Sequence, residues 1–558
     1  MAIVLKKIKR GIRPSIGGGK KSQSTLLPQY NSKTPPCTDT CPSAEDIRGY
    51  LTYIAQSEEY GRNFEESMEE AWHILTNKNP IPAIMGRVCP HPCESACNRK
   101  DKDSAVSINK VELSIGEFGL EKGLSLKKLN AKDTGKKAAV IGSGPSGISC
   151  AYQLARRGHA VTVFESKPEA GGMLRWGIPA YRLPRDIIAS EFKRVFDLGV
   201  EFKPNTKIGK DISLDQLKSD FDAVYNAIGA QTGWSLGLEG ENSANVYTGV
   251  EFLAKHNLGE ELGIGDDVIV VGGGDTAMDV ARSCKRMGAK VTVVYRRSRN
   301  EMPAIEEDIV GAEEEGIIFN FLCTPIKLSV DGGNVTGMEC IKMELGEPDE
   351  SGRASFSPID GSEFNIEASC LIPSISQEPD WEGLDELKNE KGWTTVSNDF
   401  GRVTEDGKIW AGGDITRALG LVTEAVGDGR LAAEEIDRTL MGVEYKPTPS
   451  LPVILAEKMH LQHYQDLERN SIGEKEPAER LKNFEEYIIP FTKEQILAET
   501  SRCMSCGQCY DCENCWKFCG DSAVDKLPKG QHFAFNLDNC IGCSKCMEEC
   551  PCGLIDMV

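Results

Sequence analysis

Cysteines carry the most chemistry in this sequence, and they gather near its two ends. Of 21 cysteines, five lie between residues 37 and 97 and eleven between residues 503 and 552. The later group contains two runs with the two-two-three spacing of [4Fe–4S] ligands, namely Cys509, Cys512, Cys515 and Cys519, then Cys540, Cys543, Cys546 and Cys550. In bacterial ferredoxins the last cysteine of each run binds the other cluster, so we expect Cys550 to join the first run and Cys519 the second. Zinc also uses Cys-x-x-Cys pairs, but two complete quartets favour iron–sulfur clusters.

Composition excludes several other functions. No export signal precedes the cysteines, so metal or redox chemistry is expected rather than disulfides, in a cytoplasmic protein. The net charge of −21 argues against nucleic acid as the main partner, and no apolar run is long enough to span a membrane. The basic segment 1–35 is either a disordered tail or an arm that docks on an acidic partner or subunit. Five cysteines in the middle of the chain are expected to be buried apolar side chains.

Two strand–turn–helix–strand units lie between the cysteine groups and would position nucleotides. The first, at 138–165, contains Gly142-x-Gly144-x-x-Gly147 and ends its second strand with Glu165. Gly142 permits a tight turn, Gly144 lets the backbone approach a pyrophosphate, and Gly147 lets the helix pack on the strand. The helix start offers unpaired N–H groups to the phosphates, and a carboxylate at 165 can accept hydrogen bonds from ribose hydroxyls. These features predict an FAD site.

The second unit, at 267–296, has the same turn but a different strand end. Its turn reads Gly272-x-Gly274-x-x-Ala277, and Arg296 and Arg297 stand where the first unit has its carboxylate. Guanidinium groups can bind a 2′-phosphate bidentately, whereas a carboxylate would repel it. The second site is therefore predicted to bind NADPH, with NADH as a possible substitute; the alternative is that these arginines form surface ion pairs.

The sequence resembles the small subunit of bacterial glutamate synthase and its relatives over roughly 36–440. The stretches that carry the resemblance are "GRVCPHPCESACNR", "VIGSGPSGISCAYQLARRGHAVTVFE", "GGMLRWGIPAYRLP", "GGGDTAMDVAR", "YRRSRNEMPA" and "WAGGD". The resemblance implies NADPH:acceptor electron transfer through FAD and [4Fe–4S] clusters. It further implies cofactor contacts at Pro145, Ser146, Gly172, Met173, Leu174, Arg182, Gly413, Asp414, Thr423, Ala425, Asp275 and Thr276. With its ferredoxin-like tail, the chain is most similar to the iron–sulfur flavoprotein associated with dissimilatory sulfite reductase.

The resemblance also suggests how the remaining cysteines are used. It implies one N-terminal cluster held by Cys41, Cys89 and Cys93 with Glu112 as the fourth ligand; the alternative is that Glu112 is a solvated helix residue. Members of the family have an Arg-Cys-x-x-Cys pair in the N-terminal domain that is absent here, whereas "RCMSC" occurs at 502–506. We therefore predict that Cys503 and Cys506 complete a cluster with Cys37 and Cys97. That count gives about four clusters per chain.

The predicted fold is a multidomain α/β protein in which the NADPH domain is inserted in the FAD domain. Its expected segments are a basic arm (1–35), a helical iron–sulfur domain (36–130), the FAD domain (131–250 and 373–440), the NADPH domain (251–372), a helical connector (441–500) and a ferredoxin-like 2[4Fe–4S] domain (501–558). The predicted function is an NAD(P)H:acceptor oxidoreductase that exchanges electrons with a redox protein, such as ferredoxin or dissimilatory sulfite reductase, and forms a homodimer. The alternatives are a glutamate synthase subunit and, in another class, a non-catalytic iron–sulfur scaffold or redox sensor.

Overall fold

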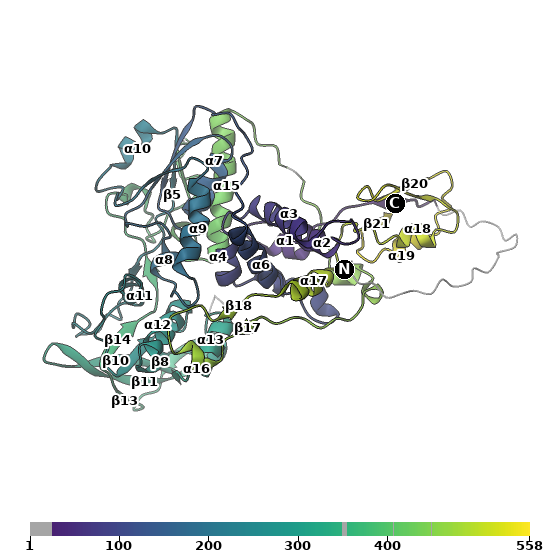
Figure 1. The fold of residues 1–558 in the computed structure, drawn as a ribbon. Helices are drawn as coiled ribbons and strands as arrows, with labels where there is room; N and C mark the ends of the chain where they lie inside the picture. The colour runs from purple at the N-terminus through teal and green to yellow at the C-terminus, as the bar shows by residue number, and fades with distance from the viewer. Residues whose placement is uncertain (1–24, 349–353, 405–406, 448) are drawn as a thin grey trace. The chain divides into compact units, whose positions relative to one another are not determined.

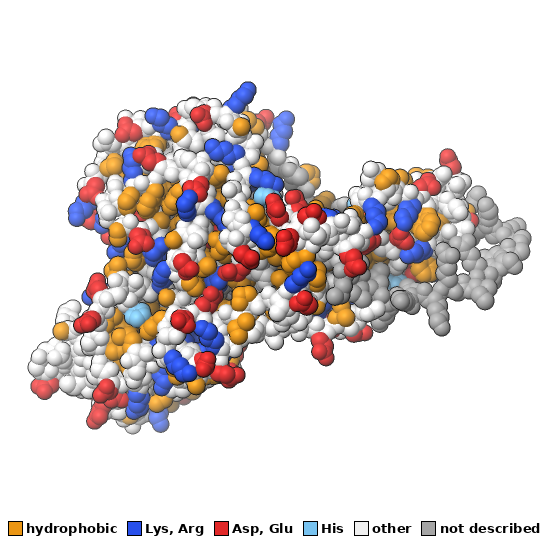
Figure 2. Space-filling view, in the orientation of Figure 1, with side chains coloured by type: hydrophobic (Ala, Val, Ile, Leu, Met, Phe, Trp, Pro, Cys, Tyr) orange, Lys and Arg blue, Asp and Glu red, His pale blue; other side chains and the backbone are white. Residues whose placement is uncertain are grey.

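The computed structural model describes residues 25–348, 354–404, 407–447 and 449–558 (Figure 1). They fall into two units, each built from separate stretches of chain. The first comprises the stretches to Lys127, Glu444–Gly473 and Pro490–Val558; the second comprises Lys128–Val443 and Glu474–Ile489. None of the described helices is both long and apolar enough to cross a bilayer. On the face drawn in Figure 2, acidic and basic side chains of the described residues are interspersed.

A five-stranded parallel sheet forms the centre of the domain that is predicted to bind FAD, here called the FAD domain, in the second unit. Its order is β16 (Ile409–Ala411), β5 (Ala223–Asn226), β2 (Lys137–Ile141), β3 (Ala160–Phe164) and β4 (Glu201–Lys203). The central strands are apolar along nearly their whole length, as expected for a parallel sheet covered on both faces. Its helices are α7 (Pro145–Ala155), α8 (Met173–Trp176), α9 (Arg185–Phe196), α10 (Leu214–Asp220), α14 (Asp414–Arg417) and α15 (Val422–Met441). Strand β16 follows the inserted domain in the sequence but joins the sheet formed before it, so the FAD domain is discontinuous.

The inserted domain, which is predicted to bind NADPH and is here called the NADPH domain, has its own parallel sheet. Its order is β14 (Cys370–Pro373), β7 (Asp267–Val271), β8 (Lys290–Tyr295) and β9 (Ile318–Phe321), with helices α11 (Gly249–Asn257), α12 (Asp275–Arg286) and α13 (Glu306–Glu314). An antiparallel sheet follows, with β10 (Cys323–Asp331), β11 (Asn334–Pro348), β12 (Ala354–Pro358) and β13 (Phe364–Glu367). A two-strand ribbon, β6 (Thr232–Gly233) with β15 (Gln377–Glu378), accompanies the two crossings between the domains.

The N-terminal part of the first unit is helical, as its apolar periodicity predicts. The helices are α1 (Pro36–Thr40), α2 (Ile47–Ala55), α3 (Phe64–Thr76), α4 (Pro82–Val88), α5 (Pro92–Ser95) and α6 (Ile108–Glu121). Asn63 and Glu66 form a reciprocal capping box that satisfies N–H groups at the start of α3. Helices α4 and α6 approach so closely that a Cβ on Gly116 would lie 2.4 Å from the backbone nitrogen of Ala83.

The cysteine-rich tail has little regular structure of its own. It contains α18 (Asn514–Phe518), α19 (Lys545–Glu548), the hairpin β19 (Val524–Lys526) and β20 (Phe533–Phe535), and β21 (Ile555–Met557). Strand β21 pairs antiparallel with β1 (Pro28–Tyr30), so residues 28–30 are part of the tail's structure. Residues 1–24, which hold most of the basic arm, lie outside the described residues.

The connector is less helical than predicted. Between 451 and 470 it forms only two short 3-10 turns, at Ala456–Lys458 and Leu461–His463, and the nine-residue helix α17 (Lys493–Ser501) follows later. Tertiary packing has overridden the helical periodicity, because Ile454, Met459 and Tyr464 are buried in the core of the cysteine-rich tail. The stretch 474–489, with β17 (Gly473–Glu474), α16 (Pro477–Arg480) and β18 (Ile488–Ile489), packs mainly with the second unit.

Candidate nucleotide sites and thiol clusters

The first glycine turn has the geometry that its sequence predicts. Gly142 adopts φ +94°, and a Cβ there would lie 2.4 Å from the carbonyl oxygen of Ala227. A Cβ on Gly147 would lie 2.0 Å from the carbonyl oxygen of Gly142, so helix α7 must begin at this close distance. A Cβ on Gly144, by contrast, would meet no atom within 4 Å. The turn is thus closed toward the sheet and open at Gly144, which fits the approach of a pyrophosphate.

Glu165 is held against this turn at the end of β3. The backbone N–H and the hydroxyl of Ser143 donate to its Oε2 at 3.0 and 2.5 Å, and the N–H of Lys167 donates to Oε1 at 2.9 Å. Because these donors hold a buried carboxylate in one orientation, Glu165 is placed as a fixed acceptor beside the nucleotide turn.

Other predicted FAD contacts gather around the same turn. A Cβ on Gly172, which precedes Met173 and Leu174 of α8, would lie 2.8 Å from the Cα of Gly144. A Cβ on Gly413 would lie 3.1 Å from the Cβ of Ser146, which follows Pro145 at the start of α7.

Helix α15, which contains Thr423 and Ala425, packs directly on α7. Ser149 Oγ donates to the carbonyl of Val426 at 2.6 Å. At the start of α14, burial raises the pKa of Asp414 to about 6. Four separate stretches of sequence, 142–149, 172–174, 413–414 and 423–426, therefore meet around the first glycine turn and helix α7.

Arg182 is engaged with the inserted domain. Its guanidinium donates to both carboxylate oxygens of Asp279 at 2.8 and 2.9 Å and lies 2.9 Å from Asp308 Oδ2. Asp279 belongs to α12 and Asp308 to α13, so this buried arginine ties the segment before α9 to the NADPH domain. A contact of Arg182 with FAD stays a prediction.

The second glycine turn is equally closed toward its sheet. Gly272 adopts φ +146°, and a Cβ there would lie 2.2 Å from the carbonyl oxygen of Ser374, whereas a Cβ on Gly274 would come no closer than 3.9 Å to any atom. Asp275 accepts from the N–H of Ile305 at 2.9 Å.

Thr276 and Ala277 complete the second turn. Thr276 Oγ1 accepts from Gln377 Nε2 at 3.1 Å, and Ala277 is fully buried in the domain core. The two turns therefore differ in their third position, where the second tolerates a methyl group.

The arginines at the end of β8 lie over an aromatic ring. The guanidinium carbons of Arg296 and Arg297 are 4.5 and 5.0 Å from the ring centre of Phe356 in β12. Arg296 is exposed, whereas Arg297 is buried and its Nε donates to the carbonyl of Ala354 at 2.8 Å. Arg299 instead forms ion pairs with Glu306 and Glu313. Arg296 is thus the more accessible of the two predicted phosphate ligands.

Two sets of thiols meet in the first unit. Burial raises the pKa of Cys41, Cys89 and Cys93, and Glu112 raises all three further. Glu112 is itself buried and accepts from Asn79 Nδ2 at 2.9 Å. The structure thus brings these four predicted ligands together, and Glu112 is not a solvated helix residue.

A second buried carboxylate accompanies this set. Burial also raises the pKa of Glu45, whose charge acts on Cys41 and Cys89. No motif in the sequence singled out Glu45, because one acidic residue four positions after a cysteine is common.

The second set joins the two ends of the chain. Burial raises the pKa of Cys37 well above its usual value, and the neighbouring Cys506, Cys503 and Cys97 raise it further. Burial also raises the pKa of Cys506, and the side chain of Asn98, next to Cys97, acts to lower it. The four thiols predicted to share a cluster are therefore neighbours.

In the tail, the structure groups the thiols largely as predicted. Burial raises the pKa of Cys515, with further contributions from Cys512, Cys550 and Cys509, so the cysteine that ends the second run lies with the first. Burial likewise raises the pKa of Cys546, and the neighbouring thiols Cys543 and Cys540 raise it further. Cys519 accepts from the N–H of Ala523 at 3.2 Å and packs in the same tail core as Cys546.

Thiol spacing distinguishes clusters from zinc. Four thiolates around one zinc ion at 2.3 Å would lie about 3.8 Å apart. Within the described residues, the one set of three metal-type ligand atoms all within 4.8 Å of one another is Cys509, Asp511 and His532. No cysteine quartet is that tight, so the quartets fit a larger cluster better than a single ion.

His532 was not identified from the sequence as part of any site. Its hydrogen bond to Asp511 and its contact with Cys509 raise the pKa of the imidazole to about 10. It lies between the two cysteine runs, outside either motif, and the hairpin β19–β20 brings it to the first tail set.

Comparison with known proteins supports this arrangement. A family model described as pyridine nucleotide-disulphide oxidoreductase matches residues 136–429, and one described as dihydropyrimidine dehydrogenase domain II, 4Fe-4S cluster, matches residues 30–124. The chain is 37% identical over 508 residues to the NADP(+)-dependent formate dehydrogenase subunit beta of Moorella thermoacetica, covering 85% of this chain and 70% of that protein. It is 36% identical over 517 residues to the NADPH-Fe(3+) oxidoreductase subunit beta of Geobacter sulfurreducens, covering 85% and 75%.

The glutamate synthase [NADPH] small chain of Escherichia coli is 35% identical over 424 residues, covering 72% of this chain and 88% of that protein. These matches confirm the predicted fold class, the resemblance to the glutamate synthase small-subunit group, and the use of FAD, NADPH and [4Fe–4S] clusters by an enzyme. The chain belongs to the pyridine nucleotide-disulphide oxidoreductase family, with an iron–sulfur domain ahead of its two nucleotide-binding domains.

Proposed function

We propose that the protein is an NADPH:acceptor oxidoreductase that exchanges electrons with a redox protein at its cysteine-rich tail. The observation that carries this proposal is the exposure of Cys543. It is the one exposed thiol among the 21 cysteines, all of which lie in the part of the chain that the structure describes. A cluster held by Cys543 would be the one nearest to an external partner, and electron transfer requires such proximity.

The chain's own residues would divide the work as follows. Gly144 and the start of α7 would receive the FAD pyrophosphate, Glu165 would fix its ribose, and Arg296 would hold the 2′-phosphate of NADPH. FAD, when bound, converts between the two-electron chemistry of a nicotinamide and the single electrons that clusters carry. The turns, which are closed toward the sheets at Gly142 and Gly272, would leave each dinucleotide only the open side of its turn.

The partner is proposed to be a catalytic redox subunit, and dissimilatory sulfite reductase is the candidate that the sequence resemblance suggests. Two relatives that each cover 85% of this chain are called beta subunits, one of a formate dehydrogenase and one of an NADPH-Fe(3+) oxidoreductase. The glutamate synthase small chain covers only 72% of it. This difference favours a tail-bearing redox subunit over a glutamate synthase subunit.

We also propose a homodimer in a cytoplasmic setting. Light scattering at micromolar concentration should give about twice the chain mass of 61.0 kDa. A particle of one chain mass would remove the dimer from the proposal.

Rapid anaerobic mixing with NADPH tests the function directly. The flavin absorbance should bleach first, and the broad iron–sulfur absorbance should fall later. Affinity purification of the native complex, followed by mass spectrometry, should then identify a redox subunit. A protein whose flavin keeps its full absorbance with NADPH is not this enzyme.

A further inference from the structure

The segment that enters the tail is attached to the N-terminal helical domain almost residue by residue. Arg99 Nη1 donates to the carbonyl of Arg502 at 2.5 Å, and Arg48 Nε donates to Ser505 Oγ at 3.1 Å. Two steps further on, the N–H of Lys33 donates to the carbonyl of Gly507 at 3.1 Å. These contacts fix both sides of the Cys503–Cys506 pair.

Cys37 and Cys97 lie on the surface that receives this segment. Asn98, next to Cys97, donates from its side chain to the carbonyl of Ile454 at 2.9 Å and to the sulfur of Met459 at 3.4 Å, which fixes the connector beside these thiols. Cys503 is buried, and the three other thiols are half-buried. Four neighbouring thiols are therefore enclosed together, an arrangement suited to the ligands of one cluster.

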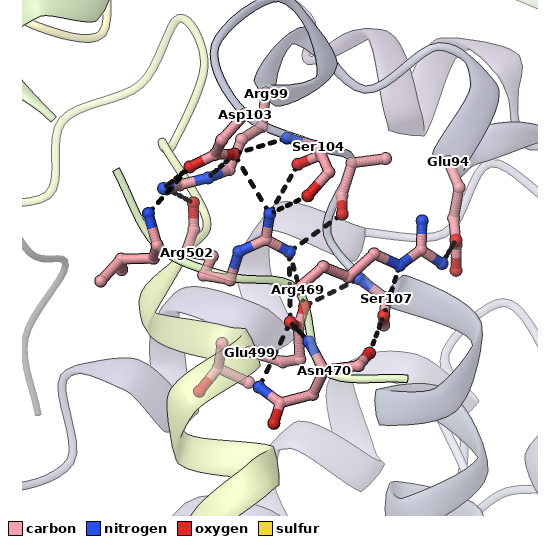
Figure 3. A network of polar contacts seen from close by, with 12 residues as sticks. Glu94, Arg99, Asp103, Ser104, Ser107, Arg469, Asn470, Glu499 and Arg502 are labelled. Carbon is pink, nitrogen blue, oxygen red and sulfur yellow. Dashed lines mark hydrogen bonds and ion pairs between the residues drawn. The ribbon is translucent and has the colours of Figure 1, made fainter. Parts of the chain in front are cut away.

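A buried ionic network lies immediately beside this site (Figure 3). Arg502, which precedes Cys503, is paired with Glu499 at 3.0 Å and with Asp103 at 3.1 Å, and its Nη2 also donates to the Ser104 carbonyl at 2.7 Å. Arg99, two residues after Cys97, is paired with the same Asp103 at 2.6 Å. One carboxylate thus links the arginines that flank the two thiols.

Glu499 extends the network to the connector. It is fully buried and accepts from the N–H of Ser107 at 2.9 Å and the N–H of Asn470 at 2.7 Å. The connector also contacts the N-terminal helical domain, because Arg469 pairs with Glu94 at 2.5 Å (Figure 3). Three stretches of chain that are far apart in sequence are held by side chains whose positive and negative charges alternate, so each buried charge has a partner.

We propose that Cys37, Cys97, Cys503 and Cys506 hold one [4Fe–4S] cluster within a single chain, and that Arg502 and Glu499 are positioning residues that set the tail-derived pair of ligands. This bridging cluster would link the N-terminal clusters to the ferredoxin-like clusters. The inference rests on the proposed function only for the presence of iron–sulfur clusters. All four thiols come from one chain, so no second subunit is needed to complete the site.

Iron analysis of the full-length protein tests the ligands. The intact protein should hold about 16 iron atoms per chain, and Cys503→Ser with Cys506→Ser should remove about four of them. The matched control is Cys284→Ser with Cys370→Ser, two neighbouring buried thiols of the NADPH domain, which should leave the iron content unchanged. Unchanged iron in the first variant overturns the bridging cluster. A wild-type protein without iron would instead overturn the proposed function.

Electron paramagnetic resonance tests the positioning residues. The signal missing from the Cys503/Cys506 variant identifies the bridging cluster, and its g-values and midpoint potential can then be followed. Arg502→Met should shift or abolish that signal and leave the others in place, and Arg502→Lys, which keeps the charge, should restore much of it. Glu499→Gln should act in the same direction as Arg502→Met.

Lys102→Ala is the control for this second test. It removes the ion pair between Lys102 and Asp466, which joins the N-terminal helical domain to the connector outside the network. The signal should stay unaltered. If Arg502→Met lowers the melting temperature but leaves the g-values and potential of this cluster as they were, its role is structural and the positioning claim fails.

Mixed oligomers distinguish one chain from two. A Cys37/Cys97 variant and a Cys503/Cys506 variant, carrying different tags, can be co-expressed and purified through both tags. Within one chain neither partner can complete the site, so the signal should stay absent. Its reappearance in the mixed dimer overturns assembly within a single chain.

Discussion

The two strand–turn–helix–strand motifs, at 138–165 and 267–296, start alike and end differently. Both begin with a buried strand and a glycine turn that is closed toward the sheet, at Gly142 and at Gly272. The first then has Gly147 and a buried Glu165, whereas the second has Ala277 and an exposed Arg296. The shared part is what a pyrophosphate requires of the backbone, and the part that differs is predicted to decide which dinucleotide is accepted.

The environments of the two strand ends differ as well. Glu165 is bonded back to its own turn through Ser143, so its position is set locally. Arg296 and Arg297 instead lie over Phe356, which belongs to the following antiparallel sheet. The carboxylate site is built within one motif, while the arginine site needs a second piece of the domain.

The largest effect is expected at the third glycine of the first turn. In Gly147→Ala the new Cβ would lie 2.0 Å from a backbone oxygen that cannot move without opening the turn, which should cost about 3 kcal/mol and release FAD. The flavin-to-protein absorbance ratio and the melting temperature measure this. Ala277→Gly, the reverse change in the second turn, should cost only about 1 kcal/mol and retain FAD. If Gly147→Ala retains its flavin, the contrast between the turns is lost.

A smaller effect is expected at the end of β8, in the second nucleotide motif. Replacing Arg296 and Arg297 by alanine should raise the KM for NADPH at least about 10-fold more than the KM for NADH, because charged hydrogen bonds to the 2′-phosphate contribute about 1.5–3 kcal/mol. Arg296→Ala alone should account for most of this, since Arg297 is held by the Ala354 carbonyl. Arg299→Ala, which only breaks pairs with Glu306 and Glu313, is the control. Equal changes for both nucleotides would falsify the assignment.

The smallest effect is a pH dependence of the FAD domain. Burial raises the pKa of Asp414 to about 6, above that of an unfolded aspartate, so the folded flavin-free protein loses stability as pH rises from about 4 to about 6. Asp414→Asn should remove this penalty, with a gain of about 3 kcal/mol at pH 7.5, about half of that at pH 5 and almost none at pH 3. Melting temperatures of flavin-free protein across this range measure it, with the exposed Asp215→Asn as control. A constant difference at all pH values would show that ionisation of Asp414 is not the cause.

Much of the fold could be predicted because its signals are local. The apolar strands before Gly142 and Gly272 are central strands of their sheets, and the glycine turns follow them as predicted. The connector could not be predicted, because Ile454, Met459 and Tyr464 have helical spacing but are buried in the tail core. The contacts of Arg182 were missed for a similar reason, since Asp279 and Asp308 lie far from it in sequence.

The sequence by itself determined the chemistry of this protein: the thiol quartets, the two dinucleotide turns, and the choice between a carboxylate and arginines at the two strand ends. These properties depend on residue type and short spacing, and both are visible in one dimension. Only the tertiary structure decided which distant groups share a site. It placed Glu45 beside Glu112, His532 beside Cys509, and the Cys503–Cys506 segment against Cys37 and Cys97. Long-range pairing of this kind depends on the packing of whole elements, because every buried charge and thiol must find a partner where the fold brings one.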